Sequence, residues 1–432
     1  MTTVSRMQPT SLNQTRLVFA TFIFCALFHF CQYAARSAPG VMVPELSESL
    51  GLRTAAVGSL VGSYYYTYSA VSLVAGGALD RFGVRGPVSV GMLTLAVGCA
   101  LFGTGLQSFT LVGRLLQGAG AAFAFTGAVY VATRNLPAAQ LASAVGIAQA
   151  FGMFGGSAGQ FVVARLIHGA SVPWQWIWFG LAAVLCVLAV GMLLMPHGKA
   201  ELAIVQSDPT DARATSGSWF DGYRTVFGNP QSWLCGLCAG LLFVPTTVGD
   251  MIWRVAFFTQ GLNIGYDRAV LSASLVLFGW VIGCPLLGWI SDWIGRRKPV
   301  VIVGGSILLV AEITVLYGSV GVADNLWLSL IFGIASGAAM LPYTIIKEVN
   351  PTKVAGTATG IMNLVVFATS AAVSAIVGSA LARLGHAGGL HALQFREVGT
   401  VSLASVAGAI AVACFLTETG RQRGERLTAE II

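Results

Sequence analysis

The chain consists mainly of apolar stretches about as long as a membrane is thick, separated by short polar turns. Inside a bilayer only helices and closed barrels satisfy every backbone hydrogen bond, and a spanning helix needs about 20 apolar residues. Twelve such stretches can be placed, at 17–44, 55–78, 86–107, 109–133, 139–166, 173–195, 232–257, 268–290, 299–320, 325–346, 354–383 and 397–417. The sequence therefore predicts an all-α integral membrane protein with twelve transmembrane helices.

The composition agrees with a membrane protein. Of the 432 residues 56% are hydrophobic and only 9% are charged, whereas soluble domains carry about 25% charged residues. The net charge of +7 falls mostly between apolar stretches, which predicts contact with lipid headgroups and no nucleic-acid partner. The eight cysteines lie inside apolar stretches, so we expect no disulfide framework. Neither a metal site nor a cofactor is predicted.

Two short segments in the chain are near copies of each other. Each has the pattern Gly-x-x-x-Asp-x-x-Gly with nearby arginines, and each lies between two apolar stretches. The first contains Gly76, Asp80, Arg81, Gly83 and Arg85, and the second contains Gly288, Asp292, Gly295, Arg296 and Arg297. Asp80 and Asp292 lie about half the chain apart, which predicts two similar helical bundles, the internal repeat found in many secondary transporters.

One long polar stretch, 197–230, divides the apolar segments into six and six. We therefore expect an N-terminal tail at 1–16, a six-helix bundle at 17–196, a linker at 197–230, a second bundle at 231–418 and a tail at 419–432. Sixteen of the 24 Lys and Arg residues fall on the side of the termini and linker, five on the other side and three inside helices. The positive-inside rule places the termini and linker in the cytoplasm.

These features together resemble the major facilitator superfamily along essentially the whole chain. The run from Arg114 through Gln117 and Gly118 to Gly120 is similar to a second signature of that family. The Gly-Pro antiporter signature is not matched in 146–159. The resemblance implies secondary transport by alternating access, with the duplicated turns acting as a conformational latch that locks one state.

Three further segments resemble a bacterial branch that includes Pht-type intraphagosomal nutrient transporters, siderophore-related permeases and magnetosome-membrane transporters. They are Tyr64 to Tyr68, Arg36 to Met42, and Lys347 to Pro351 followed by Gly356 to Ala358. This branch implies a small-molecule or iron-linked solute. It also implies a bacterial cytoplasmic membrane, or an internal membrane derived from it.

Arg36 lies inside the first apolar segment, where an arginine costs about 2.5–3.5 kcal/mol on insertion scales. His29, Gln32, Tyr33 and Arg36 share one helix face, so we expect this face to line a central cavity. In the alternative reading Arg36 extends to the membrane surface, since Pro39 and Pro44 could mark the helix end.

Asp250 and Arg254 lie four residues apart in the seventh segment and are well placed to pair. Because this segment is equivalent to the first one, we expect the pair to face Arg36 across a common cavity, as part of a substrate or gate cluster. A purely structural ion pair is the alternative. Tyr64 and Tyr68 share a face and could line the same cavity.

Two other polar positions carry candidate roles. Arg114 and Gln117 begin the fourth segment, where the family resemblance implies proton coupling or binding and a helix cap is the alternative. Glu312 lies midway along the ninth segment, where burial disfavours a charged carboxylate. Glu312 is the candidate proton carrier, and its alternative role is packing against a polar neighbour.

The predicted function is therefore secondary active transport, with protons as the coupling ion in symport. Iron or iron-chelate transport is the alternative, and a transporter-like sensor is a weaker one. The sequence has no nucleophile elbow, phosphate loop or metal-ligand cluster, which argues against an enzyme.

Overall fold

A computed structural model of the protein describes residues 12–135, 138–195, 219–318, 322–351, 354–384 and 391–419. Every regular element in these ranges is helical. The first half contains α1 (Leu12–Ser37), η1 (Ala38–Val41), α2 (Val43–Leu50), α3 (Thr54–Gly62), α4 (Tyr64–Phe82), α5 (Arg85–Gly103), α6 (Gln107–Asn135), α7 (Ala138–Ala164), η2 (Arg165–Gly169) and α8 (Trp174–Leu194). The second half contains α11 (Trp219–Phe227), α12 (Pro230–Val244), η3 (Pro245–Trp253), α13 (Arg254–Ala256), η4 (Phe257–Gly261), α14 (Tyr266–Ile294), α15 (Lys298–Tyr317), α16 (Val322–Ser336), η5 (Gly337–Met340), α17 (Leu341–Glu348), α18 (Ala355–Leu384) and α19 (Ala392–Ala413).

Eleven helical segments in the described ranges are long and apolar enough to cross a membrane. The stretch predicted as a single helix at 55–78 instead forms two helices, α3 and α4, which meet at Ser63. Large apolar side chains such as Val187, Leu194 and Val310 are exposed on the outside of the bundle, as expected for surfaces that contact lipid.

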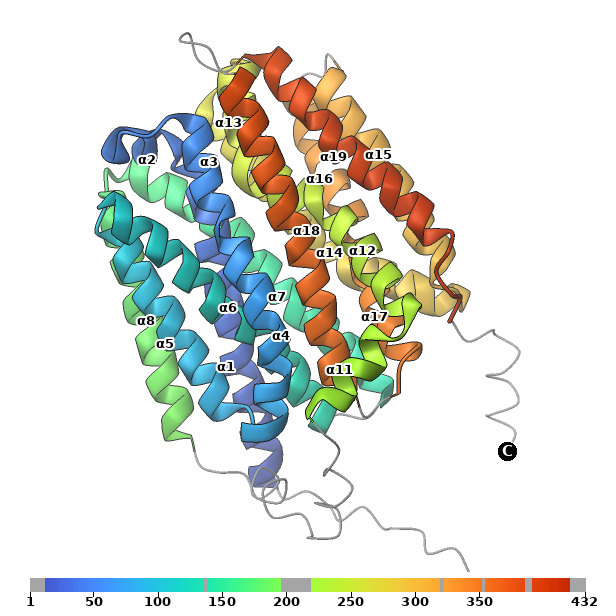
Figure 1. The fold of residues 1–432 in the computed structure, drawn as a ribbon. Coiled ribbons are helices and arrows are strands. Elements are labelled where there is room, and N and C mark those ends of the chain that lie inside the picture. The colour runs from blue at the N-terminus through green and yellow to red at the C-terminus, as the bar shows by residue number, and fades with distance from the viewer. Residues whose placement is uncertain are drawn as a thin grey trace, which may run out of the picture.

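The helices of the two halves lie side by side, blue to green on one side and yellow to red on the other (Figure 1). Two helix pairs join the halves, α4 with α18 and α7 with α14. Ser69 Oγ donates to Leu364 O at 2.9 Å in the first pair, and Ser157 Oγ donates to Ser274 O at 2.9 Å in the second. Polar groups that would be costly in lipid are thus satisfied between the halves.

Three more of the predicted continuous helices are interrupted, besides 55–78. The stretch 17–44 ends its α-helix at Ser37 and continues through η1, 232–257 passes through π-helical turns in η3 and η4, and 325–346 contains the tight turn η5. Pro39 and Pro245 stand inside two of these interruptions, because proline removes a helical hydrogen bond. Such π-helical turns are frequent at functional sites.

The interruptions η1 and η3 meet at one end of the molecule, here called the far end, while α11 lies at the opposite end, the linker end (Figure 1). At the far end Gly40 approaches the backbone of Met251, and the Tyr266 hydroxyl donates to the carbonyl of Val41. At the linker end the Tyr223 hydroxyl of α11 donates to Leu73 O at 2.8 Å. Of the predicted linker, residues 197–218 lie outside the described ranges, and 219–227 form α11.

The duplicated turns lie at the linker end. Gly83 and Gly295 have φ values of +73° and +71°, a region that glycine adopts without steric cost. In the second turn Arg297 pairs with Asp292, and with Glu348 of α17 at 3.2 Å. In the first turn the equivalent Arg85 donates to the last carbonyls of α8, those of Met192 and Leu193.

The other residues of the predicted latch can be placed only in part. Gly76 packs close to the backbone of Gly356, whereas an added side-chain carbon at Gly288 would meet nothing. Arg296 is exposed. The side chains of Asp80 and Arg81 lie outside the described part, so their latch role stays a prediction.

Candidate functional site

Arg36 stands in the last turn of α1 and forms the centre of a buried polar cluster. Its Nη2 donates to Gln32 Oε1 at 3.1 Å, and the Tyr64 hydroxyl donates to the same oxygen at 2.9 Å. Gln32 Nε2 in turn lies 3.1 Å from His29 Nδ1. The helix face predicted from the sequence therefore forms one hydrogen-bonded chain from His29 to Arg36.

Aromatic rings surround the guanidinium group of Arg36. Its central carbon lies 4.3 Å from the ring centroid of Tyr33, 4.8 Å from that of Tyr68 and 5.0 Å from that of Tyr64. Phe367 of α18, from the other half, lies at 4.9 Å. These ring faces stabilise the cation, and Phe367 places the cluster at the interface between the halves.

The cluster is closed from solvent, with Arg36 only 1% exposed. This burial excludes the alternative in which the side chain extends to the membrane surface. Arg36 Nε, Arg36 Nη1 and His29 Nε2 have no hydrogen-bond partner within the described part of the chain, and no carboxylate there pairs with Arg36. A buried cation with two free donors is a site that an anion can complete.

Arg114 of α6 binds the backbone that carries the Arg36 cluster. It donates to the carbonyls of Ala35 at 2.9 Å, Arg36 at 3.0 Å and Val61 at 3.0 Å, and to Gln117 Oε1 at 2.8 Å. These carbonyls end the helices α1 and α3, where they lack a helical donor. Arg114 therefore caps the ends of two helices inside the bundle, which is the alternative role given above. Its guanidinium group also lies over the ring of Tyr64, which links this cap to the Arg36 cluster.

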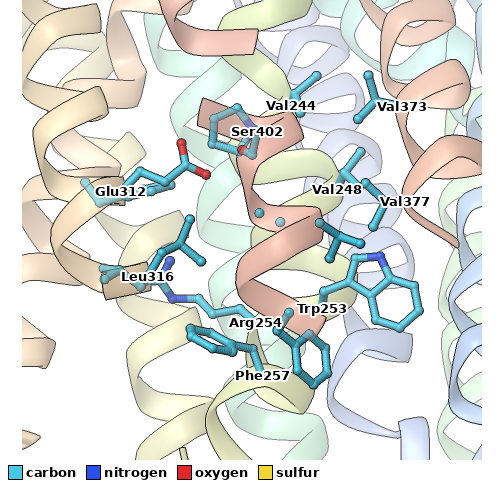
Figure 2. A pocket seen from close by; sticks show the side chains of 17 residues that line it. Val244, Val248, Trp253, Arg254, Phe257, Glu312, Leu316, Val373, Val377 and Ser402 are labelled. Carbon is cyan, nitrogen blue, oxygen red and sulfur yellow. The ribbon is translucent and has the colours of Figure 1, made fainter. Parts of the chain in front are cut away.

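Asp250 and Arg254 do not belong to the Arg36 cluster and form an ion pair of their own. Arg254 Nε lies 3.5 Å from Asp250 Oδ1, and Arg254 Nη2 donates to Ser329 Oγ at 2.8 Å. Arg254 and Glu312 line a cavity of about 80 Å³ inside the second half, together with Ser402 of α19 (Figure 2). Arg36 is not among the residues that line this cavity, whereas Arg254 shares it with Glu312, so the pair does not face Arg36 across one common cavity as expected.

Sequence reasoning missed several members of the Arg36 cluster. Tyr65 is not among the predicted site residues, and its hydroxyl donates to Thr247 O of η3 at 2.9 Å. Gln149 Nε2 donates to the Tyr33 hydroxyl at 3.1 Å, and the Tyr343 hydroxyl donates to Asn363 Oδ1 at 2.7 Å nearby. Gln149 could have been identified as an amide side chain within an apolar segment. Nothing in the sequence around Phe367 distinguishes it from other apolar residues.

Comparisons with known proteins agree with this architecture. The chain is 27% identical over 370 residues to the probable sulfoacetate transporter SauU of Cupriavidus necator, covering 78% of this chain and 81% of that protein. It is 23% identical to the inner membrane metabolite transport protein YhjE of Escherichia coli, covering 69% and 71%. The fold matches the proton:xylose symporter XylE with a TM-score of 0.70 at 15% identity, covering 95% of this chain and 98% of XylE.

A bacterial homologue of the human lysosomal transporter Spinster has the same fold, with a TM-score of 0.68 at 17% identity and coverage of 92% and 96%. These structural relatives are all small-solute or membrane transporters by description. Because residues 25–375, most of its length, match the family described as Major Facilitator Superfamily, the chain belongs to that family of membrane transporters.

Proposed function

We propose that the protein is a secondary active transporter that carries a small organic anion, with protons as the coupling ion. The observation that carries the proposal is Arg36, a buried cation with two unpartnered guanidinium nitrogens between the two halves. A carboxylate or sulfonate can accept a charge-assisted hydrogen bond from either of these nitrogens. Sites between halves are also where transporters with internal repeats bind their solutes.

The surroundings of Arg36 favour a small and weakly hydrated anion. Tyr64 and Tyr68 present ring faces and hydroxyl groups, and Gln32 offers an amide that is already oriented by Tyr64. Such rings hold the apolar part of a solute while Arg36 fixes its charged end. One relative is described as a probable sulfoacetate transporter, and sulfoacetate is a small organic anion.

Solute binding and movement of the halves can share the same side chains. Tyr65 reaches from α4 to Thr247 of η3, and Phe367 of α18 closes the other side of Arg36. An anion that enters must separate these contacts and then be enclosed by them again. Closure around the solute from both halves is the geometric requirement of alternating access.

Iron transport receives no comparable support. The relatives named above are not iron transporters by description, and in the described ranges no group of three or more His, Cys, Asp or Glu side chains is placed to hold a metal ion. The narrower resemblance to siderophore-related and magnetosome transporters has no support in these comparisons, so we propose the organic anion. A bacterial cytoplasmic membrane is consistent with the bacterial relatives.

The test is uptake by proteoliposomes of labelled sulfoacetate, acetate and, as a neutral solute, xylose, with and without an imposed pH gradient. Arg36→Gln should lower anion uptake about 10- to 100-fold, because a charge-assisted hydrogen bond contributes about 1.5–3 kcal/mol. Arg53→Gln is the matched control, since Arg53 is exposed at the far end. Equal anion uptake by Arg36→Gln and Arg53→Gln, or transport of xylose alone, would contradict the proposal.

A further inference from the structure

The cavity in the second half contains charged side chains that the proposed solute binding at Arg36 does not involve. Its lining is mostly apolar or glycine, as with Val248, Leu316 and Phe332. The polar groups of the lining belong to Arg254, Glu312, Ser402 and the indole of Trp253. Its volume of about 80 Å³ has room for a few water molecules. Figure 2 shows Glu312 and Ser402 on one side of the cavity and Arg254 on another.

Arg254 is held firmly in this cavity. Its guanidinium carbon lies 5.2 Å from the ring centroid of Phe258 and 5.1 Å from that of Phe332, and Nη2 donates to Ser329 Oγ. Ser329 Oγ also lies 2.6 Å from Ser272 Oγ. This arrangement fixes the positive charge 3.5 Å from Asp250 and in the same cavity as Glu312.

The two carboxyl groups have incomplete hydrogen bonding. Asp250 is 1% exposed and Glu312 is 6% exposed. Neither oxygen of Asp250 has a hydrogen-bond partner that satisfies normal geometry in the described part of the chain, and Glu312 Oε2 has none. Carboxylates inside a membrane normally pair or take a proton, since an uncompensated charge there costs about 2.5–3.5 kcal/mol.

The charges of Arg254, its partner Asp250 and the cavity residue Glu312 do not balance without a proton. Arg254 from α13 stands against Asp250 from η3 and Glu312 from α15, while α14, α16 and α19 contribute the neutral Ser272, Ser329, Asn325 and Ser402. Arg396 of α19 is engaged elsewhere, since its Nε donates to Leu316 O at 2.8 Å. One guanidinium and two carboxyl groups are neutral when one carboxyl carries a proton.

We propose that Asp250, Arg254 and Glu312 form a proton-binding site inside the second half, separate from the solute site at Arg36. One proton is shared between the two carboxyl groups, and Arg254 pairs with whichever is ionised. In this structure Arg254 pairs with Asp250, so the proton belongs to Glu312. This inference rests on the proposed function for its role in transport, because the coupled proton is the one held here.

The segment η3 connects this site to the interface between the halves. Asp250 faces Arg254, while its neighbour Met251 faces Gly40 of η1 and Thr247 accepts from Tyr65. When Asp250 takes up the proton, its ion pair with Arg254 is lost and the irregular turn that carries Met251 loses an anchor. Proton binding can thereby change the contact that closes the far end.

The test uses protons alone, with no assumption about the solute. Infrared difference spectra of the purified full-length protein, recorded across a pH titration, report the carbonyl band of a buried protonated carboxyl. Wild type and the matched control Glu397→Gln, whose side chain is exposed on α19, should show the same titrating band. Glu312→Gln and Asp250→Asn should each lose it, and Arg254→Met should increase its area about twofold, because both carboxyl groups then need a proton.

Folding of each variant is checked by circular dichroism and by elution as a single species, and Glu312→Gln alone suffices if another variant misfolds. The proposal would be overturned if the titrating band persists unchanged in Glu312→Gln, or if its area in folded Arg254→Met is the same as in wild type. Proteoliposome assays separate this inference from the proposed function. If Glu312→Gln loses pH-driven accumulation but still exchanges solute, the result supports both the proton site and the proposed function. If the infrared bands change as expected but wild type shows no pH-driven transport, the result contradicts only the proposed proton coupling.

Discussion

The contact between Gly40 of η1 and the backbone of Met251 in η3 offers the sharpest test of how the far end closes. A methyl group added at Gly40 would lie 2.3 Å from the Met251 carbonyl oxygen and 3.0 Å from its carbonyl carbon. The neighbour is backbone, which cannot rotate away as a flexible side chain would. Gly40→Ala should therefore prevent the two halves from closing fully at this end.

The size of the effect follows from this distance. Ordinary van der Waals contact begins at 3.4 Å, so η1 and η3 must separate by about 1 Å. Overpacking of this kind costs roughly 1–3 kcal/mol. Because the cost applies only when the far end is closed, it shifts the equilibrium toward the open form by about 5- to 150-fold.

The shift can be measured as a distance between the halves. Spin labels at Arg53→Cys and Arg268→Cys, both exposed near the far end, report its opening in a background without the native cysteines. In Gly40→Ala the distribution of label distances should move toward the longer, open population.

Gly249→Ala is the matched control, because an added carbon at Gly249 in the same η3 segment meets nothing within 4 Å. It should keep the wild-type distribution of distances. If Gly40→Ala also keeps this distribution, the close approach of η1 to η3 does not limit closure and the reasoning is wrong.

Three further changes test other contacts. Tyr266→Phe removes the hydroxyl that donates to Val41 across the far end. The label distances should again move toward the open population, but less, because the closed form loses only about 0.5–1.5 kcal/mol; unchanged distances would show that this bond does not stabilise closure. Asp292→Asn removes a charge that pairs with Arg297 while Glu348 stays in place, and it should slow transport with little change in melting temperature; wild-type uptake rates would refute a latch role. Arg114→Met leaves the carbonyls of Ala35, Arg36 and Val61 without their donor, at about 1–3 kcal/mol for each group, so thermal unfolding should begin at a clearly lower temperature; an unchanged melting curve would contradict the capping role.

Apolar length predicted most of the helices, because lipid requires every backbone bond to be made within a segment. The interruptions could not be located in the same way. Pro39 and Pro245 mark two of them, but the break at Ser63 between α3 and α4 has no proline and follows from tertiary contacts such as the bond from Arg114 to Val61 O. Hydropathy averages over such breaks, so a run of apolar residues gives the length of a span and not its continuity.

The site was predictable where a single helix carries it. Helical spacing placed His29, Gln32, Tyr33 and Arg36 on one face. In the structure Gln32 joins His29 to Arg36, and the ring of Tyr33 contacts Arg36. Depth along equivalent helices did not predict which way Asp250 and Arg254 point, because the π-helical turns of η3 rotate the residues that follow. Phe367 reaches Arg36 only through the packing of α18 against α4, and no spacing within one helix encodes such a contact.

The buried charge of Arg36 has an electrical consequence. An arginine remains protonated at all physiological pH values, so Arg36 contributes one positive charge within the membrane when the site is empty. Moving a full charge through a potential of 100 mV changes the free energy by about 2.3 kcal/mol. A bound monovalent anion cancels this charge. Binding of such an anion therefore removes the contribution that Arg36 itself makes to the voltage dependence of the carrier.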